Sequence, residues 1–162
     1  MFYQNGPVYF LAGLNTPGAS VNVTVPHGKA ILFPLFNYIN DYPCPPEYNF
    51  EPVPPQTLTQ FLTEGAIATA TLASNMSVTI DGSSVSNPAN YLFTTGLYTF
   101  TGNAELPSCF DVCVTGSPQP AVSSGYFMML KPLSKGQHTV HYHTEIPAWN
   151  AVQDGTYNIT IP

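Results

Sequence analysis

The sequence predicts a mainly β protein, an antiparallel β-sandwich or jelly roll with one helix at about residues 57–73. Three observations lead to this prediction. Many short apolar or alternating segments are separated by turns rich in Gly and Pro. Only one segment has helical spacing, and there is no alternation of strands and helices of the kind that favours a parallel sheet. A chain of 162 residues can bury a full core, so we expect one domain, residues 1–162.

The first expected strands lie before residue 37. Residues 8–12 form a compact apolar run, and residues 21–25 alternate valine with polar residues, as a half-buried strand does. Residues 29–36 are strongly apolar, and Pro34 predicts an edge strand or a bulge because proline cannot donate to a β-ladder. We expect two short strand pieces around a kink. The Pro-rich segment 37–56 is expected to be a long loop, of the kind often used in function.

One helix and the remaining strands are expected after this loop. Thr57 and Gln60 form a capping-box pattern before apolar residues at roughly helical spacing, which predicts the helix at about residues 57–73. Asp81 and Gly82 predict a tight turn after strand 77–80. Further strands are expected at 91–93, 97–100 and 126–130, in the histidine-rich segment after Gly136, and at 157–161, with a second long loop at 103–123.

The charge composition excludes one large class of function. The chain has three lysines, no arginine and nine acidic residues, for a net charge of -6, and only 7% of its residues are charged. Nucleic-acid binding requires clustered cations, so we expect no nucleic-acid partner. A surface covered by Thr, Ser, Asn and Tyr is common in extracellular proteins, including those that pack into arrays or filaments.

Cysteines and sequons favour an extracellular or cell-surface location. In an oxidising compartment Cys44 would pair with Cys109 or Cys113 and leave one thiol free. No stretch resembles a signal peptide and no apolar run spans a membrane, so an exported form would begin after the cleavage point. Three glycosylation acceptor patterns are present, at Asn22, Asn75 and Asn158.

Three of the four histidines lie within residues 138–143 and are the clearest functional lead. Alternate side chains of a strand point to opposite faces, so His141 and His143 share one face while His138 points the other way. Two imidazoles at this spacing suit copper, zinc, nickel or iron, and a third ligand must come from elsewhere. The candidates for that ligand are His27, Glu145, Asp41, Glu47 and Asp154.

The spacing Leu-x-x-Gly-x-His-x-x-His-x-His over residues 133–143 resembles the copper-binding strand of copper/zinc superoxide dismutases. The resemblance implies that His141 and His143 are copper ligands and that His138 supports them through hydrogen bonds. This sequence departs from the family at Thr139, where a small glycine is usual. It also has no histidine after His143 to complete the family's set of ligands.

A second resemblance covers most of the chain. Segments 6–13, 25–30, 33–37, 78–82, 125–127, 133–141 and 157–160 look like a family of exported microbial proteins without an assigned function. This resemblance implies a secreted single domain with stapled loops and implies no reaction. Members of that family often have a small residue where His27 stands.

These observations lead to three hypotheses of function. The first is a secreted β-sandwich with a metal site at His141 and His143, helped by His27 or His138. Copper is the expected metal and zinc the alternative, and a copper site would be redox-active if it is catalytic. The second is a structural cell-surface or matrix subunit that self-associates through exposed strand edges. The third is a carbohydrate-binding module for a polysaccharide.

The third hypothesis uses aromatic side chains in loops. Tyr38, Tyr42, Tyr48 and Trp149 are the candidates for an aromatic platform, and the alternative, which we favour, is that they cover the core and loops. Asp41 with Glu47 or Glu51 is also a carboxylate pair of the type used in sugar hydrolysis, which requires a controlled separation of the two groups. The sequence identifies no catalytic residue and leaves open whether the protein is an enzyme.

Overall fold

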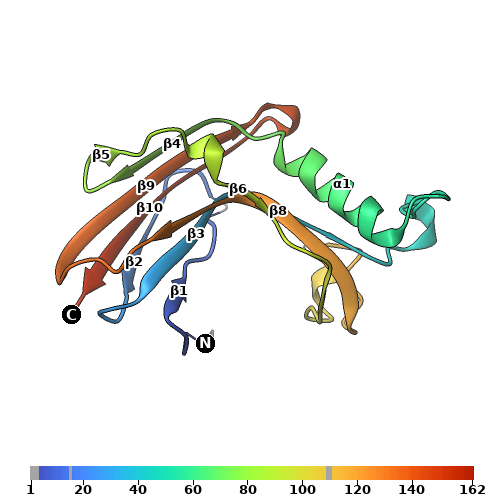
Figure 1. Cartoon of the computed structure of the whole chain (residues 1–162), viewed down its shortest axis with the longest axis horizontal. Helices are drawn as coiled ribbons and strands as arrows, with labels where there is room; N and C mark the ends of the chain where they lie inside the picture. The colour runs from blue at the N-terminus through green and yellow to red at the C-terminus, as the bar shows by residue number, and fades with distance from the viewer. Residues whose placement is uncertain (1–3, 15, 109–110) are drawn as a thin grey trace. The chain divides into compact units, whose positions relative to one another are not determined.

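The computed structural model describes residues 4–14, 16–108 and 111–162. Within these ranges the chain forms two five-stranded sheets and one α-helix (Figure 1), which confirms the predicted class, a mainly β sandwich with one helix. The helix is α1 (Leu58–Ala70). The strands are β1 (Val8–Phe10), β2 (Ala19–Thr24), β3 (Ala30–Asp41), β4 (Ser74–Ile80), β5 (Ser83–Ser84), β6 (Leu92–Thr94), β7 (Tyr98–Phe100), β8 (Gln119–Leu130), β9 (Gly136–Ile146) and β10 (Ala151–Ile161).

The chain divides into two compact units, and each is described by itself. The sandwich unit comprises residues 1–36, 72–92 and 125–162, and the helix unit comprises residues 37–71 and 93–124. The long strands β3 and β8 each contribute residues to both units. The expectation of a single domain over residues 1–162 stays a prediction.

Both sheets mix antiparallel and parallel pairing. One sheet has the order β1-β3-β8-β6, with β7 paired to β8, and the other has the order β2-β10-β9-β4-β5. β9 pairs antiparallel with β10 and β4. In contrast to the expected antiparallel pairing, β1 lies parallel to β3 and β2 lies parallel to β10. Between β1 and β3 the chain passes through β2 in the other sheet, and such a crossover allows the returning strand to run parallel.

Three aromatic rings lie together in the sandwich core. Phe33 of β3 lies with its ring centroid 6.4 Å from that of Tyr142 and 5.9 Å from that of Tyr157, and the two tyrosine rings are 5.8 Å apart. Both tyrosines are buried, yet their hydroxyls are hydrogen-bonded: Tyr142 Oη accepts from Leu14 N at 2.9 Å, and Tyr157 Oη donates to Ala12 O at 2.7 Å. The segment after β1 is therefore attached to the core.

β3 runs through Pro34 without interruption and reaches Asp41, so the predicted kink and the predicted start of a loop at residue 37 are wrong. The N–H of Ala30 donates to Pro7 O, so even-numbered residues of β3 direct their backbone N–H toward β1. Pro34 shares this parity, but the pairing with β1 ends at Leu32. The missing N–H of proline therefore removes no ladder hydrogen bond.

β8 and β9 are also longer than expected. β8 begins at Gln119, inside the predicted loop 103–123, and β9 continues to Ile146. The sequence pattern concealed the start of β8 because this central strand is buried along most of its length and needs no alternation of polar and apolar residues. The Asp81-Gly82 turn between β4 and β5 is confirmed, with positive φ angles at both residues.

Helix α1 begins where the sequence predicts. Thr57 Oγ1 accepts from Gln60 N at 3.3 Å and Gln60 Oε1 accepts from Thr57 N at 2.9 Å, which is a capping box. Gly65 lies mid-helix because a Cβ there would overlap the side-chain amide of Asn40. Among the described residues, no helix is long and apolar enough to cross a bilayer.

Candidate functional site

The outward face of β9 carries the histidine pair. Along β9 the side chains of Val140, Tyr142, Thr144 and Ile146 are buried. The intervening residues His141, His143 and Glu145 point to the other side of the sheet and are half-buried. Strand alternation therefore predicted correctly which two imidazoles share a face. We call this set of three residues the histidine face.

Asp154 of β10 joins the two histidines of this face. It lies opposite His143 in the ladder, with Oδ2 3.0 Å from His143 Nδ1 and Oδ1 3.4 Å from His141 Nε2. Glu145 Oε1 is 3.4 Å from His143 Nε2, and Asn75 Nδ2 donates to Glu145 Oε2 at 2.6 Å. Two of the carboxylates considered as third ligands therefore do lie beside the histidines.

The contacts of His143 favour its protonated form. The hydrogen bond with Asp154 raises the pKa of His143, and Glu145 adds to this effect. The same contact lowers the pKa of the Asp154 carboxyl. An imidazole with a carboxylate at each ring nitrogen is arranged as an imidazolium that donates twice.

Metal ligation was expected at His141 and His143 with His27 or His138. Among the residues that the structure describes, no three His, Cys, Asp or Glu side chains are arranged to hold a metal ion. His138 Nδ1 is 2.7 Å from Asp81 Oδ2 and its Nε2 is 2.9 Å from Ser134 O. Both ring nitrogens of His138 thus contact neighbouring turns, and its inclusion among the ligands stays a prediction.

His27 lies away from the histidine face. β2 pairs with β10 as far as the row of Thr24 and Thr160, and His27 follows beyond that row. The partner of His141 in β10 is Thr156, four positions before Thr160. At a strand rise of about 3.3 Å per residue, the turn that carries His27 is at least ~13 Å from His141 along the strands. The strand pairing therefore does not by itself bring His27 to the histidine face, and its role as a ligand stays a prediction.

The three sequon asparagines also belong to this sheet. Asn158 Nδ2 donates to Ser20 Oγ at 3.0 Å and to Asn22 Oδ1 at 3.1 Å. Asn75 is the exposed residue that contacts Glu145. Their glycosylation stays a prediction, and Asn22 and Asn158 are direct neighbours across β2 and β10.

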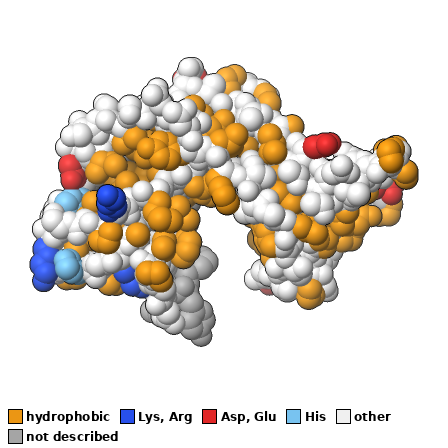
Figure 2. All heavy atoms as spheres, in the orientation of Figure 1, with side chains coloured by type: hydrophobic (Ala, Val, Ile, Leu, Met, Phe, Trp, Pro, Cys, Tyr) orange, Lys and Arg blue, Asp and Glu red, His pale blue; other side chains and the backbone are white. Residues whose placement is uncertain are grey.

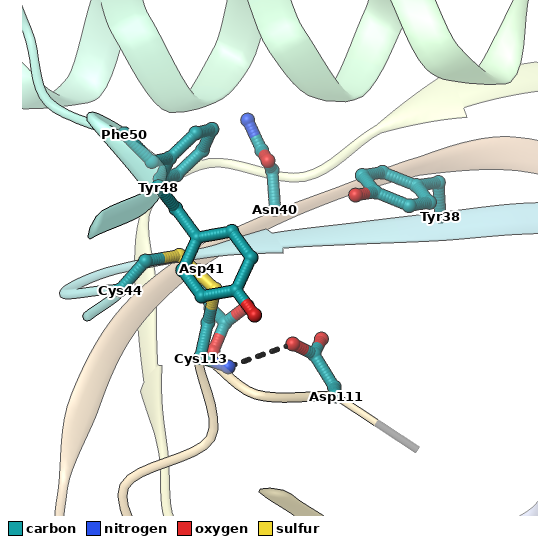
Figure 3. Close-up of a pocket in the computed structure, with 8 residues that line it drawn as sticks. All are labelled: Tyr38, Asn40, Asp41, Cys44, Tyr48, Phe50, Asp111 and Cys113. Carbon is teal, nitrogen blue, oxygen red and sulfur yellow. Dashed lines mark hydrogen bonds between the residues drawn. A yellow bond between two sulfur atoms is a disulfide. The ribbon is translucent and has the colours of Figure 1, made fainter. Parts of the chain in front are cut away.

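A second candidate site is a pocket of about 200 Å³ in the helix unit (Figure 3). It is lined by the last residues of β3, the loop that follows and the loop before β8. The lining residues are Tyr38, Asn40, Asp41, Cys44, Tyr48, Phe50, Asp111 and Cys113. The pocket therefore combines three aromatic rings, two carboxyl groups, one amide and a pair of cysteines.

Neutral amide groups hold the two carboxylates in place. Gln119 Nε2 donates to Asp41 Oδ2 and, at 2.9 Å, to Cys113 O. Gln119 Oε1 accepts from Thr115 N at 2.7 Å, which fixes the orientation of the amide. Cys113 N donates to Asp111 Oδ1 at 2.9 Å, as the dashed line in Figure 3 marks.

Asn40 contributes an acceptor to the same pocket. Its Nδ2 donates to Leu62 O of α1 at 3.1 Å, and in Figure 3 this nitrogen points toward the helix. The residue as a whole is only 5% exposed, and among the described residues no hydrogen bond reaches its Oδ1. This carbonyl oxygen is in the pocket lining and can accept a hydrogen bond from a ligand.

The Asp41 carboxyl is perturbed by its surroundings. Burial, and then the negative charge of Asp111, raise the pKa of Asp41 to about 6. Burial also raises the pKa of Tyr38, and the charges of Asp111 and Asp41 raise it further. The pocket therefore concentrates negative charge beside aromatic rings.

A disulfide closes one wall of the pocket. Cys44 and Cys113 are bonded across a sequence separation of 69 residues. This confirms one of the two pairings expected for Cys44. Cys109, the alternative partner, lies outside the described residues.

The four aromatic residues considered for a platform do not all line the pocket. Tyr38 and Tyr48 line the pocket, whereas Tyr42 packs beside the buried residues of the helix unit and Trp149 belongs to the sandwich unit, where its ring contacts Phe36. The expected carboxylate pair is different too: Asp111 accompanies Asp41, and the pocket lining includes neither Glu47 nor Glu51. Sequence reasoning missed Asp111, Asn40, Phe50 and Gln119. The signal that could have found Asp111 is the pairing of Cys44 with Cys113, because this bond joins the loop after β3 to the loop that carries Asp111.

Comparisons with known proteins give little guidance. No family model matches the chain, and no curated protein matches it. Two solved structures resemble it in outline: PbICP-C in complex with falcipain-2, at 10% identity and a TM-score of 0.34, and amebosin in solution, at 11% identity and a TM-score of 0.25. The alignments cover 97% and 91% of this chain and all of the two other chains. At such TM-scores the likeness carries no argument about function.

Proposed function

We propose that the protein is an exported carbohydrate-binding module whose pocket in the helix unit receives one sugar residue of a polysaccharide. The observation that carries the proposal is the lining of the pocket, in which the rings of Tyr38, Tyr48 and Phe50 lie with the carboxyl groups of Asp41 and Asp111. A sugar ring has C–H faces, on which aromatic rings pack by dispersion. It also has hydroxyl groups, from which carboxylate and amide oxygens accept hydrogen bonds.

The size of the pocket fits a single ring. Its volume of about 200 Å³ is below the roughly 300–1,000 Å³ of sites for drug-sized ligands. At ~30 Å³ per water molecule in the liquid, it corresponds to about seven waters, which is the size class of one pyranose. Tyr48 is 55% exposed, so its ring is available to the next residue of a polysaccharide chain.

The walls are suited to a preformed site. The Cys44–Cys113 disulfide ties the two lining loops together, and Gln119 is hydrogen-bonded to both Asp41 and Cys113. Groups held in this way lose little conformational freedom when a ligand binds, and preorganisation of this kind favours affinity.

Binding to a panel of insoluble and immobilised polysaccharides tests the proposal. We expect retention on at least one of them, and a loss of about five- to tenfold in affinity for Tyr48→Ala because an aromatic contact is removed. Tyr91→Ala is the matched control, since Tyr91 is an exposed tyrosine of the sandwich unit outside the pocket. A flat response across the panel, or an equal loss in both variants, would contradict the proposal.

The histidine face favours a second candidate function, binding of copper, or of zinc, at His141 and His143. The observation behind it is that Asp154 lies within 3.4 Å of a nitrogen of each imidazole, so that a rearrangement of these three side chains could bring two nitrogens and one carboxylate to a metal ion that their present arrangement does not hold. A metal ion would have to replace the contacts of His143 with carboxylates. Stoichiometric copper after loading and dialysis, lost in His141→Ala and His143→Ala, supports this candidate. Unchanged metal content in the variant that carries both substitutions would rule out metal binding at this face.

Self-association as a structural subunit stays a third prediction. β2 and β5 are the outer strands of their sheet, and an unpaired strand edge can add another chain. Sedimentation velocity over a wide concentration range tests it. A monomer at the highest concentration would rule it out.

A further inference from the structure

The net charge of the protein resides in one unit. The helix unit contains six carboxylates, Asp41, Glu47, Glu51, Glu64, Glu105 and Asp111, and no Lys, Arg or His. The sandwich unit contains Asp81, Glu145 and Asp154 with all three lysines and all four histidines. Six acids without a base give -6, and three acids with three lysines give 0, which together equal the net charge of -6. On the face shown in Figure 2, Lys and His side chains accordingly lie over the sandwich unit.

No cationic side chain of the helix unit can neutralise its pocket. Among the described residues, the Gln119 amide donates to Asp41 and the Cys113 N–H donates to Asp111, and both donors are uncharged. Taking a carboxylate out of water is unfavourable unless a positive charge accompanies it. The buried Asp41 is therefore set up to gain from a cation that comes from outside the unit, and the half-buried Asp111 adds a second negative charge beside it.

The types of side chain that line the pocket favour an organic cation over a metal ion. Calcium takes about six to eight oxygen ligands, whereas the side chains of this pocket offer the oxygens of Asp41, Asp111 and Asn40 beside three rings and a disulfide. Aromatic faces attract ammonium groups through their quadrupole, by about 0.5–2 kcal/mol. The combination of rings with carboxylates suits an alkylammonium group better than a hard metal ion.

We propose that the ligand of this pocket is a positively charged amino sugar, with its ammonium group against Asp41 and Asp111 and its ring against the aromatic side chains. This inference rests on the proposed carbohydrate binding and adds the charge of the bound residue. Asn40 Oδ1 provides a further acceptor for an N–H or hydroxyl group. N-acetylation of the sugar would remove the charge and weaken binding.

The pH dependence of binding reports the ionisation of the Asp41 carboxyl. A bound cation favours ionised Asp41, so affinity for a ligand of fixed charge falls as the pH decreases through about 6, where burial and Asp111 place the pKa of this carboxyl. The groups that face Asp41 are Asp111, Tyr38, Tyr98 and the neutral Gln119. The pKa of both tyrosines is raised above 10.0, and the helix unit has no histidine, so neither residue type titrates in this window.

Calorimetric titration of the full chain with four probes tests the inference. The probes are a glucosamine trimer, its N-acetylated form, a trimethylated glucosamine whose charge is independent of pH, and choline, which carries the charge without the sugar. We expect the glucosamine trimer to bind about tenfold more tightly than the N-acetylated trimer at pH 7, about 1.4 kcal/mol. The trimethylated sugar should bind about tenfold more weakly at pH 5 than at pH 7.5.

Asp111→Asn should abolish the preference for the charged trimer, because the amide keeps an acceptor for Cys113 N but carries no charge. Glu64→Gln is the control for net charge, since Glu64 is a carboxylate of α1 outside the pocket. The comparison of charged and N-acetylated trimers needs no variant and holds even if Asp111→Asn folds poorly.

The outcomes separate the inference from the proposed function. Equal binding of both trimers, unaffected by Asp111→Asn, overturns the charge inference and leaves carbohydrate binding intact. Binding of choline without either trimer, lost in Asp111→Asn, supports the cationic pocket and overturns the amino sugar and the carbohydrate function. Failure of all four probes overturns both.

Discussion

Replacing the buried Asp41 by asparagine should stabilise the helix unit at neutral pH. Asp41 is only 4% exposed, and its pKa is raised from 3.8 to about 6 by burial and by Asp111. A raised carboxyl pKa means that the folded state holds this proton more tightly than the unfolded state does. The stabilisation by protonation is complete below about pH 3.8 and is lost as the pH rises through about 6.

The magnitude follows from the shift of the pKa. About two pKa units at 1.36 kcal/mol each amount to roughly 3 kcal/mol, by which ionised Asp41 destabilises the fold above pH 6. Asparagine has no charge and still accepts from Gln119 through its carbonyl oxygen. We therefore expect Asp41→Asn to raise the free energy of unfolding by ~1–3 kcal/mol at pH 8 and to leave it nearly unchanged at pH 3.5.

Two optical probes measure this change separately in the two units. The single α-helix belongs to the helix unit, so far-ultraviolet circular dichroism in urea follows that unit. The only tryptophan, Trp149, belongs to the sandwich unit, so its fluorescence reports on that unit. A loss of stability at pH 8, or the same gain at both pH values, would refute the electrostatic reasoning.

Three further changes test the packing. Gly65→Ala should lower the stability of the helix unit by ~1–3 kcal/mol, because its Cβ overlaps the Asn40 amide, although alanine favours a helix by up to about 1 kcal/mol; a higher circular dichroism midpoint would contradict this. Replacing Cys44 and Cys113 by serine should destabilise the same unit by about 4 kcal/mol in the chain-entropy model for a loop of 69 residues, and an unchanged urea midpoint argues against the bond. Thr144→Val should stabilise the sandwich unit by about 1 kcal/mol, because Thr144 Oγ1 is buried without a described partner; tryptophan fluorescence would detect it, and a lower midpoint would show that the hydroxyl is used.

Local chemistry was predictable wherever neighbours in the sequence determine it. The capping box of Thr57 and Gln60 and the turn at Asp81 depend on residues a few positions apart, and both are confirmed. The shared face of His141 and His143 follows from the geometry of any strand. The path of β3 through Pro34 was not predictable, because it depends on where β1 ends.

The pocket could not be derived from the sequence because its walls are distant in the chain. Tyr38 and Asp41 are at the end of β3, whereas Asp111 and Cys113 lie about 70 residues later. The choice of Cys113 as the partner of Cys44 is what brings these loops together, and the spacing of the cysteines left that choice open. The excess of acidic residues was visible, but its confinement to one unit requires knowledge of the fold.

Titration of the isotope-labelled protein with glucosamine trimer, followed by nuclear magnetic resonance of its amides, tests the central claim most directly. Asn40 Nδ2, Gln119 Nε2 and the backbone N–H of Cys113 all contact the pocket wall or its carboxylates. We predict saturable shifts of these signals with the charged trimer and much smaller shifts with its N-acetylated form. Shifts confined to β9, or none in the helix unit at saturating sugar, would contradict the assignment of the pocket.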